Sequence, residues 1–156
     1  MTREILLADT SYVSAAQRVE ERRADYSWPQ LVRSRLRAAK IAVSVVSVGE
    51  VRAGNLERGV TPPRVSASER WLARFPRVDV DEAIAHRWAI LDEQGHRRGL
   101  VFSDNDLWIA ATARTLGVPI VTCDRAFAQM PELEVEVVYL PSNRPAATGR
   151  AAVRGG

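Results

Sequence analysis

The chain has 156 residues, of which 46% are hydrophobic and 26% are charged. These proportions are typical of one globular domain, and they exclude a disordered or fibrous chain. The formal net charge is +3, from 22 Lys and Arg residues against 19 Asp and Glu residues, which permits a nucleic-acid partner without requiring one.

Three further features bear on where the protein acts. Cys123 is the only cysteine, so an intrachain disulfide is excluded and a reducing compartment is favoured. No apolar run approaches the roughly 20 residues that span a bilayer. The N-terminal segment, with Glu4 and a very short apolar run, does not have the pattern of a signal peptide. We therefore expect a cytoplasmic protein without membrane association.

Short apolar runs alternate with helical patterns along the chain. In chain order we predict a strand at 5–7, a helical region at 12–40 with Pro29 as a break or a new start, a strand at 41–46, a helix at 47–59 and a break at 61–63. These are followed by a helix at 66–75, a strand at 77–80, helices at 81–98 and 103–116, a strand at 118–122, and an edge strand at 133–140. This order predicts an α/β fold with a central, mostly parallel sheet flanked by helices.

The end of the chain differs in composition from the rest. Residues 141–156 are small, poor in apolar side chains and rich in Gly and Pro, which is typical of a disordered tail. We therefore expect one domain over residues 1–140. The tail contains Arg144, Arg150 and Arg154 and no acid, so it accounts for the whole net charge of +3.

Acidic residues follow three of the predicted buried strands. Asp9 follows the strand at 5–7, Asp124 follows the strand at 118–122, and Glu50 lies in the first turn of the helix after the strand at 41–46. Because the carboxyl ends of parallel strands share one edge of a sheet, these side chains can meet there. Asp106 joins them if the helix at 103–116 begins at the same edge.

Each acid alone also has a purely structural interpretation. Ser47 with Glu50, and Ser103 with Asp106, have the spacing of helix-capping pairs. Asp9 alone suits a helix cap, and Asp124 alone suits a turn. The joint pattern favours chemistry instead, because clustered carboxylates repel one another unless a cation lies between them. Oxygen ligands without His or Cys indicate Mg²⁺ or Mn²⁺, and such clusters serve phosphodiester hydrolysis.

Three segments of the chain resemble the blocks of PIN-domain ribonucleases, most closely the VapC-type toxins of bacterial toxin–antitoxin systems. The segments are LLADTSYV, VSVVSVGEVRAG and FSDNDLWIAATARTLGVPIVTCDRAF. The resemblance implies a PIN-like fold in which four acids bind the metal and carry out catalysis. Carried over onto this chain, these acids are Asp9, Glu50, Asp106 and Asp124, and the polar helpers are Thr10 or Ser11 beside Asp9 and Thr122 beside Asp124.

The choice between Asp104 and Asp106 depends on position. Only Asp106 directly precedes the LWIAATA run, so we assign the metal role to it, and we expect Asp104 to be a helix cap or a helper beside the metal ligands. We also expect Trp28 to anchor packing and Cys123 to be a small core residue. The basic run at 33–40 is interpreted as a solvated face, with contact to an RNA backbone as the alternative.

The resemblance also implies a function and partners. It implies a Mg²⁺-dependent endoribonuclease that cuts structured RNA, such as tRNA or rRNA, with a metal-activated water and leaves 5′-phosphate and 3′-hydroxyl ends. A small VapB-type antitoxin protein would neutralise it, and a homodimer is expected. One alternative is a catalytically weak PIN-fold module that binds RNA or protein. Another, a phosphatase or flap-type nuclease, is disfavoured because the chain has no arch, DNA-binding appendage or Gly-rich phosphate loop.

Overall fold

The computed structural model describes residues 2–142 of the chain. In chain order the elements are β1 (Ile5–Ala8), α1 (Thr10–Glu20), α2 (Gln30–Ala38), β2 (Lys40–Ser44), α3 (Val45–Glu57), α4 (Pro62–Leu72), β3 (Arg77–Val78), α5 (Glu82–Arg97), α6 (Asp104–Leu116), β4 (Ile120–Thr122), the 3₁₀ helix η1 (Arg125–Leu133) and β5 (Val137–Tyr139).

The strands form one parallel sheet in the order β3-β2-β1-β4-β5. β1 lies at its centre, where Leu7 is in register with Ala42 of β2 and with Ile120 of β4. β5 lies at an edge, as predicted. The expected α/β fold with a parallel sheet is therefore confirmed, and all the strands end at the same edge.

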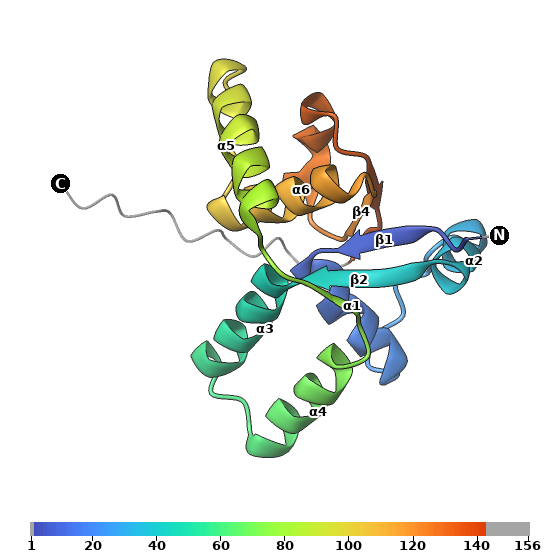
Figure 1. Cartoon of the computed structure of the whole chain (residues 1–156). Helices are drawn as coiled ribbons and strands as arrows, with labels where there is room; N and C mark the ends of the chain where they lie inside the picture. The colour runs from blue at the N-terminus through green and yellow to red at the C-terminus, as the bar shows by residue number, and fades with distance from the viewer. Residues whose placement is uncertain (1, 143–156) are drawn as a thin grey trace.

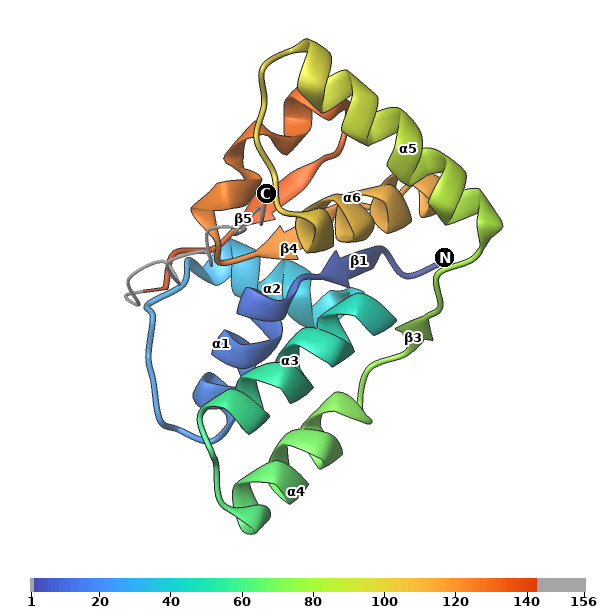
Figure 2. The same ribbon diagram turned by 90° about the vertical axis from the view of Figure 1, so that its left-hand side faces the viewer.

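Helices cover both faces of the sheet (Figures 1 and 2). Because successive residues of a strand point to opposite faces, neighbours in β1 belong to two different cores. Leu7 packs with residues of α5, α6 and η1, including Leu91 and Phe127. Leu6 packs on the other face with residues of α1 and α3, including Val13 and Val48. The sheet is thus buried between two layers of helices.

The boundaries of several elements differ from the prediction. The strand expected at 41–46 ends at Ser44, and Val45 already begins α3. The break at 61–63 is a helix start, because Pro62 begins α4 and proline suits the first turn of a helix. The helix η1 was not predicted. Pro29, by contrast, precedes α2 as expected.

The segment that joins α1 to β2 is held to the domain by aromatic packing. Trp28 is buried, and its ring stacks against those of Tyr12 and Tyr26. Its indole Nε1 donates a hydrogen bond of 2.8 Å to the carbonyl oxygen of Pro141. The prediction that Trp28 anchors packing is confirmed. The predicted disordered tail lies, from residue 143 onward, outside the described residues. Within residues 2–142, no helix has the length and apolar character needed to cross a membrane.

Candidate active site

The first acid lies where the central strand ends. Asp9 follows β1 directly and is the N-cap of α1, where its carboxylate accepts a hydrogen bond of 3.0 Å from the backbone N–H of Tyr12. Its exposed fraction is 3%. Burial raises the pKa of Asp9 to about 7, hydrogen bonds from Tyr12 and Ser11 oppose the rise, and the negative charge of Asp124 adds to it. Asp9 is therefore both the N-cap of α1 and one of the predicted metal-binding acids.

Ser11 connects the ends of β1 and β4. Its hydroxyl lies 2.8 Å and 2.9 Å from the two carboxylate oxygens of Asp9, and it accepts a bond of 2.9 Å from the backbone N–H of Cys123. It also lies 3.3 Å from the hydroxyl of Thr122, which in turn accepts from the backbone N–H of Asp124. The two predicted helpers Ser11 and Thr122 thus fix the strand ends from which Asp9 and Asp124 emerge.

Glu50 comes from the neighbouring helix α3. One of its carboxylate oxygens accepts a hydrogen bond of 2.7 Å from the hydroxyl of Thr10, the first residue of α1. The predicted pairing of Ser47 with Glu50 as a cap is wrong, because Ser44 is the N-cap and its hydroxyl accepts from the backbone N–H of Val46. Glu50 therefore lies in the second turn of α3, with its carboxylate held by α1.

Asp106 lies in the first turn of α6. Ser103 caps this helix and accepts a hydrogen bond from the backbone N–H of Asp106, so the predicted capping role of Ser103 is confirmed. Asp104 is the first residue of the helix and is exposed, so the cap expected of it belongs to Ser103 instead. Its role as a helper stays a prediction.

The acids influence one another electrostatically. Burial raises the pKa of Asp106 to about 6; the hydrogen bond with Ser103 opposes this, and the charges of Asp124 and Glu50 add to it. Asp124 also raises the pKa of Asp9. The charge of each of the four acids therefore influences, or is influenced by, the charge of at least one other. The structure therefore brings together the residues that the sequence predicted, from four separate segments of the chain.

The donor set suits a hard divalent cation. It consists of carboxylate and hydroxyl oxygens. Burial is the main cause of the raised pKa values of Asp9 and Asp106, the neighbouring acids add to the rise, and a cation bound beside these carboxylates would compensate their charge. Within residues 2–142, no three acidic, His or Cys side chains already form a compact metal-binding group.

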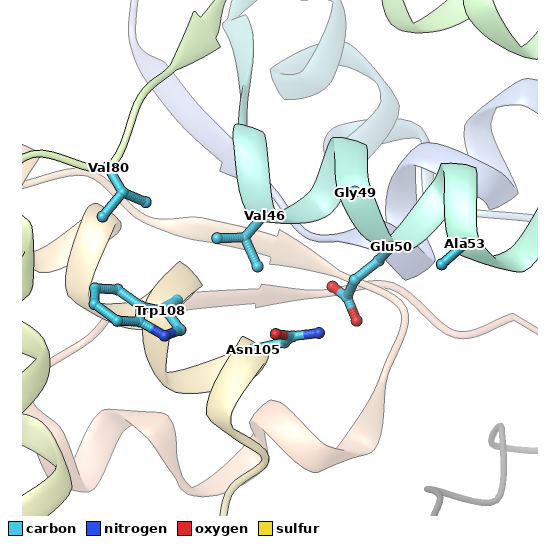
Figure 3. Close-up of a pocket in the computed structure, with 7 residues that line it drawn as sticks. All are labelled: Val46, Gly49, Glu50, Ala53, Val80, Asn105 and Trp108. Atoms are coloured by element: carbon cyan, nitrogen blue, oxygen red, sulfur yellow. The ribbon is translucent and has the colours of Figure 1, made fainter.

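A recess of about 440 Å³ opens beside the acids, between α3 and α6. We call it the Glu50 recess. Figure 3 shows the carboxylate of Glu50 close to the amide of Asn105, and the side chains of Trp108 and Val80 farther along the recess, away from Glu50. It is lined by Val46, Gly49, Glu50, Ala53, Val80, Asn105 and Trp108.

Two lining residues of this recess were not predicted as site residues. Asn105 lies between two acids in the sequence, and that adjacency was its only signal. The ring of Trp108 stacks on that of Trp88 with centroids 5.1 Å apart. Its indole also faces the recess (Figure 3). Cys123 is a buried free thiol, as predicted.

The chain belongs to the PIN domain family, whose family model, described as PIN domain, matches residues 6–133. Within that family it is a VapC-type chain. It is 37% identical to Ribonuclease VapC4 of Mycobacterium tuberculosis over 136 residues, 83% of this chain and 93% of that protein. It is 33% identical to Ribonuclease VapC5 of the same organism over 93 residues, 58% of this chain and 69% of that protein.

Solved structures agree with the fold. A chain in the crystal structure of VapBC2 from Rickettsia felis, bound to a DNA fragment from its promoter, superposes with a TM-score of 0.70. The match covers 86% of this chain and 98% of that chain at 19% sequence identity. The resemblance predicted from the three sequence blocks is therefore confirmed at the level of the family and of its fold.

The bond from Thr10 to Glu50 gives a direct test of how the site is assembled. We expect Thr10→Val to lower the free energy of unfolding by about 1 kcal/mol, the usual value of such a bond. We also expect RNA cleavage to fall about 10-fold, because Glu50 loses the partner that orients it. Chemical denaturation and a cleavage assay measure the two effects.

Thr115→Val is the matched control for this variant. The Thr115 hydroxyl donates 2.7 Å to the carbonyl oxygen of Ala111 near the far end of α6, so the same atom is lost at a distance from the acids. We expect a similar or smaller loss of stability and unchanged cleavage. Equal cleavage by the Thr10 and Thr115 variants would show that the orientation of Glu50 does not matter.

Proposed function

We propose that this chain is a Mg²⁺-dependent endoribonuclease toxin, with Mn²⁺ as an alternative cofactor, and that a cognate antitoxin neutralises it. One observation carries the proposal. Four acids from four separate segments lie at the carboxyl edge of the sheet, close enough for their charges to alter one another's pKa values. The VapC4 and VapC5 relatives, which are named as ribonucleases, support RNA as the substrate.

The metal-binding residues in this proposal are Asp9, Glu50, Asp106 and Asp124. Bound Mg²⁺ supplies charge neutralisation at the scissile phosphate and a lowered pKa of the attacking water. The chain supplies the positions of the carboxylates. Asp9 is fixed by the N-terminus of α1, and Glu50 by Thr10.

Hydroxyl groups keep this arrangement rigid. Ser11 and Thr122 hold the ends of β1 and β4 together, so the separation of Asp9 and Asp124 does not depend on a flexible loop. Rigid support of this kind lowers the reorganisation that the site must undergo before hydrolysis. The four acids and these helpers thus form one positioned unit.

The substrate and partners follow from the family. We propose structured RNA, such as tRNA or rRNA, as the substrate and a small VapB-type antitoxin protein as the partner, acting in the cytoplasm. The likeness to the VapBC2 structure supports a shared fold, and the resemblance to VapC-type toxins supports the antitoxin and a homodimer. Co-expression with the neighbouring antitoxin gene and light scattering of the purified chain test both associations.

Metal removal tests the proposed activity. We expect the purified chain to cleave RNA with Mg²⁺ or Mn²⁺, to lose this activity when a chelator is added, and to recover it when the metal is restored. The products should carry 5′-phosphate and 3′-hydroxyl ends, which ligation-based end mapping detects. Cleavage that persists in chelator, or products with a cyclic 2′,3′-phosphate, would contradict the mechanism. RNA binding without any cleavage would favour the catalytically weak module instead.

A further inference from the structure

A second pocket lies on the same face of the sheet as α1, α3 and α4, and its lining is strongly basic. Its volume is about 180 Å³. Only Val51 and Val60 among its lining residues are apolar, and none is acidic. We call it the arginine pocket. It is lined by Ser14, Gln17, Arg18, Arg23, Val51, Asn55, Arg58, Val60, Arg64 and Ser68.

Two of its four guanidinium groups are held in place by neighbouring side chains. Arg18 Nε donates a bond of 2.7 Å to the hydroxyl of Tyr26, and the guanidinium carbon lies 5.9 Å from the centre of that ring. Arg58 donates to the side-chain oxygen of Asn55, whose amide nitrogen donates to Ser68. Each of these bonds uses one of the five N–H donors of a guanidinium. Both arginines are therefore positioned by the fold and keep donors for a ligand.

The positive charge of the pocket is compensated only in part. Glu21 pairs with Arg23 at 2.5 Å and, more loosely, with Arg64 at 3.8 Å. Two of the four guanidinium groups of the pocket, those of Arg23 and Arg64, therefore share the carboxylate of Glu21. Guanidinium groups match phosphate oxygens in geometry and charge, so an excess of them in a small polar pocket favours a phosphate ligand.

The two helices that begin at the acids also lead to the arginine pocket. Thr10 and Glu50 bond to each other across α1 and α3, and the same helices carry Arg18 and Asn55 into the pocket. At about 1.5 Å of helix rise per residue, the pocket lies roughly 8–12 Å along these helices from the acids. Over a distance of this size the acids and the pocket can contact different phosphates of the same RNA strand.

We infer that the arginine pocket binds a backbone phosphate of the RNA substrate, a few nucleotides away from the scissile bond. This inference rests on the proposed ribonuclease function. The acids repel a polyanion, so the attraction that holds RNA must come from cations outside the acidic cluster. The arginine pocket supplies such cations on the helices that carry Thr10 and Glu50. Its polar lining and small volume suit a phosphate group better than an apolar protein segment.

RNA binding by a chain that cannot cleave tests the inference. In an Asp106→Asn background, the pair Arg58→Gln and Arg64→Gln should lower the affinity for a fluorescent single-stranded RNA roughly 10-fold at low salt. The slope of log affinity against log salt should fall by about 0.7, because the pocket holds one phosphate and each lost phosphate contact contributes about 0.7. Fluorescence anisotropy over a salt series measures both quantities.

A matched control keeps the change in net charge equal. Arg70 is exposed on α4 but does not line the pocket, and Arg97 lies on α5 in an exposed ion pair. The pair Arg70→Gln and Arg97→Gln should change affinity less than about 2-fold, since distant exposed charges are screened. Arg58→Lys should keep the salt slope and lose part of the affinity, because lysine keeps the charge and lacks the fork.

Each outcome decides the inference. A slope and affinity that are equal in the pocket pair and the control pair would overturn the phosphate site and leave the ribonuclease proposal intact. Unchanged RNA affinity with weaker binding of the antitoxin would assign the pocket to the protein partner and overturn the inference as well. If the unaltered chain neither cleaves RNA with Mg²⁺ nor binds it, the proposed function fails and the inference fails with it.

Discussion

Asp106→Asn is expected to lower the rate of RNA cleavage by at least about 1,000-fold, which corresponds to about 4 kcal/mol of transition-state stabilisation. Asn keeps the size of the side chain but loses the charge that a metal ion requires. The variant should remain folded, because burial raises the pKa of Asp106 to about 6 and the charged form is therefore disfavoured in the folded protein. Single-turnover cleavage kinetics with Mg²⁺ measure the loss.

Asp104→Asn is the control for this experiment. It removes the same charge two residues earlier in the same helix, from an exposed side chain. We expect its effect on the rate to be less than about 3-fold, because surface charges near a site act weakly through water. If the two variants lose activity equally, the assignment of the metal role to Asp106 rather than Asp104 is wrong.

The sequence predicted best those residues whose position depends on neighbours close in the sequence. Asp9 directly follows β1, and Asp124 lies two residues after the last residue of β4. A parallel sheet brings the ends of such strands to one edge whatever the conformation of the loops. The capping of α6 by Ser103 was predictable for the same reason, since the cap and its partner are three residues apart. Short-range order of this kind depends little on tertiary packing.

The start of α3 shows what local patterns cannot resolve. The run IAVSVV has β-branched residues on both sides of Ser44, so its apolar pattern alone does not mark the end of β2. In the structure Ser44 ends the strand and caps the helix, because its hydroxyl can accept the backbone N–H of Val46. Ser47, which the sequence suggested as the cap, is buried inside the helix with no hydrogen-bond partner for its hydroxyl.

The arginine pocket was not predictable from sequence for a different reason. Arg18, Arg58 and Arg64 lie on or beside three helices that are distant in the chain, and only the packing of α1, α3 and α4 brings them together. The basic run that does stand out in the sequence, at 33–40, supplies Arg35, which pairs with Glu4 and Glu136. The continuous basic run at 33–40 was therefore a poorer guide to a basic pocket than arginines that are scattered along the sequence.

Asp9→Asn is expected to make the metal-free protein more stable at neutral and alkaline pH, although it should abolish cleavage. Folding raises the pKa of Asp9 from 3.8 to about 7 because the carboxyl is buried. Between those two pH values the folded chain keeps a proton that the unfolded chain releases, so stability falls as the pH rises through this window. From this pKa difference, we expect removal of the charge to raise the free energy of unfolding by an amount on the order of 2–4 kcal/mol at about pH 8.

The pH dependence separates this electrostatic cost from the capping role of the same residue. At about pH 4 Asp9 is protonated in the folded chain, so the advantage of Asn should nearly vanish there. Asn is itself a good N-cap, so the bond from the backbone N–H of Tyr12 should persist in the variant. Urea denaturation at several pH values in chelator measures the difference. A variant that is less stable than the unaltered chain at about pH 8 would show that the charge stabilises α1 instead.

Added Mg²⁺ should reverse the order of stability. The metal stabilises only a folded chain that binds it, by an amount that grows with its concentration over the dissociation constant. The unaltered chain should therefore gain stability with Mg²⁺ at about pH 8, whereas Asp9→Asn should gain little, because the cation replaces the proton as the partner of the buried carboxylate. Equal gains in both chains would mean that the ion binds elsewhere. The Asp9 carboxylate would then destabilise the fold without metal and stabilise it with metal. This behaviour is expected of a residue whose role is catalytic rather than structural.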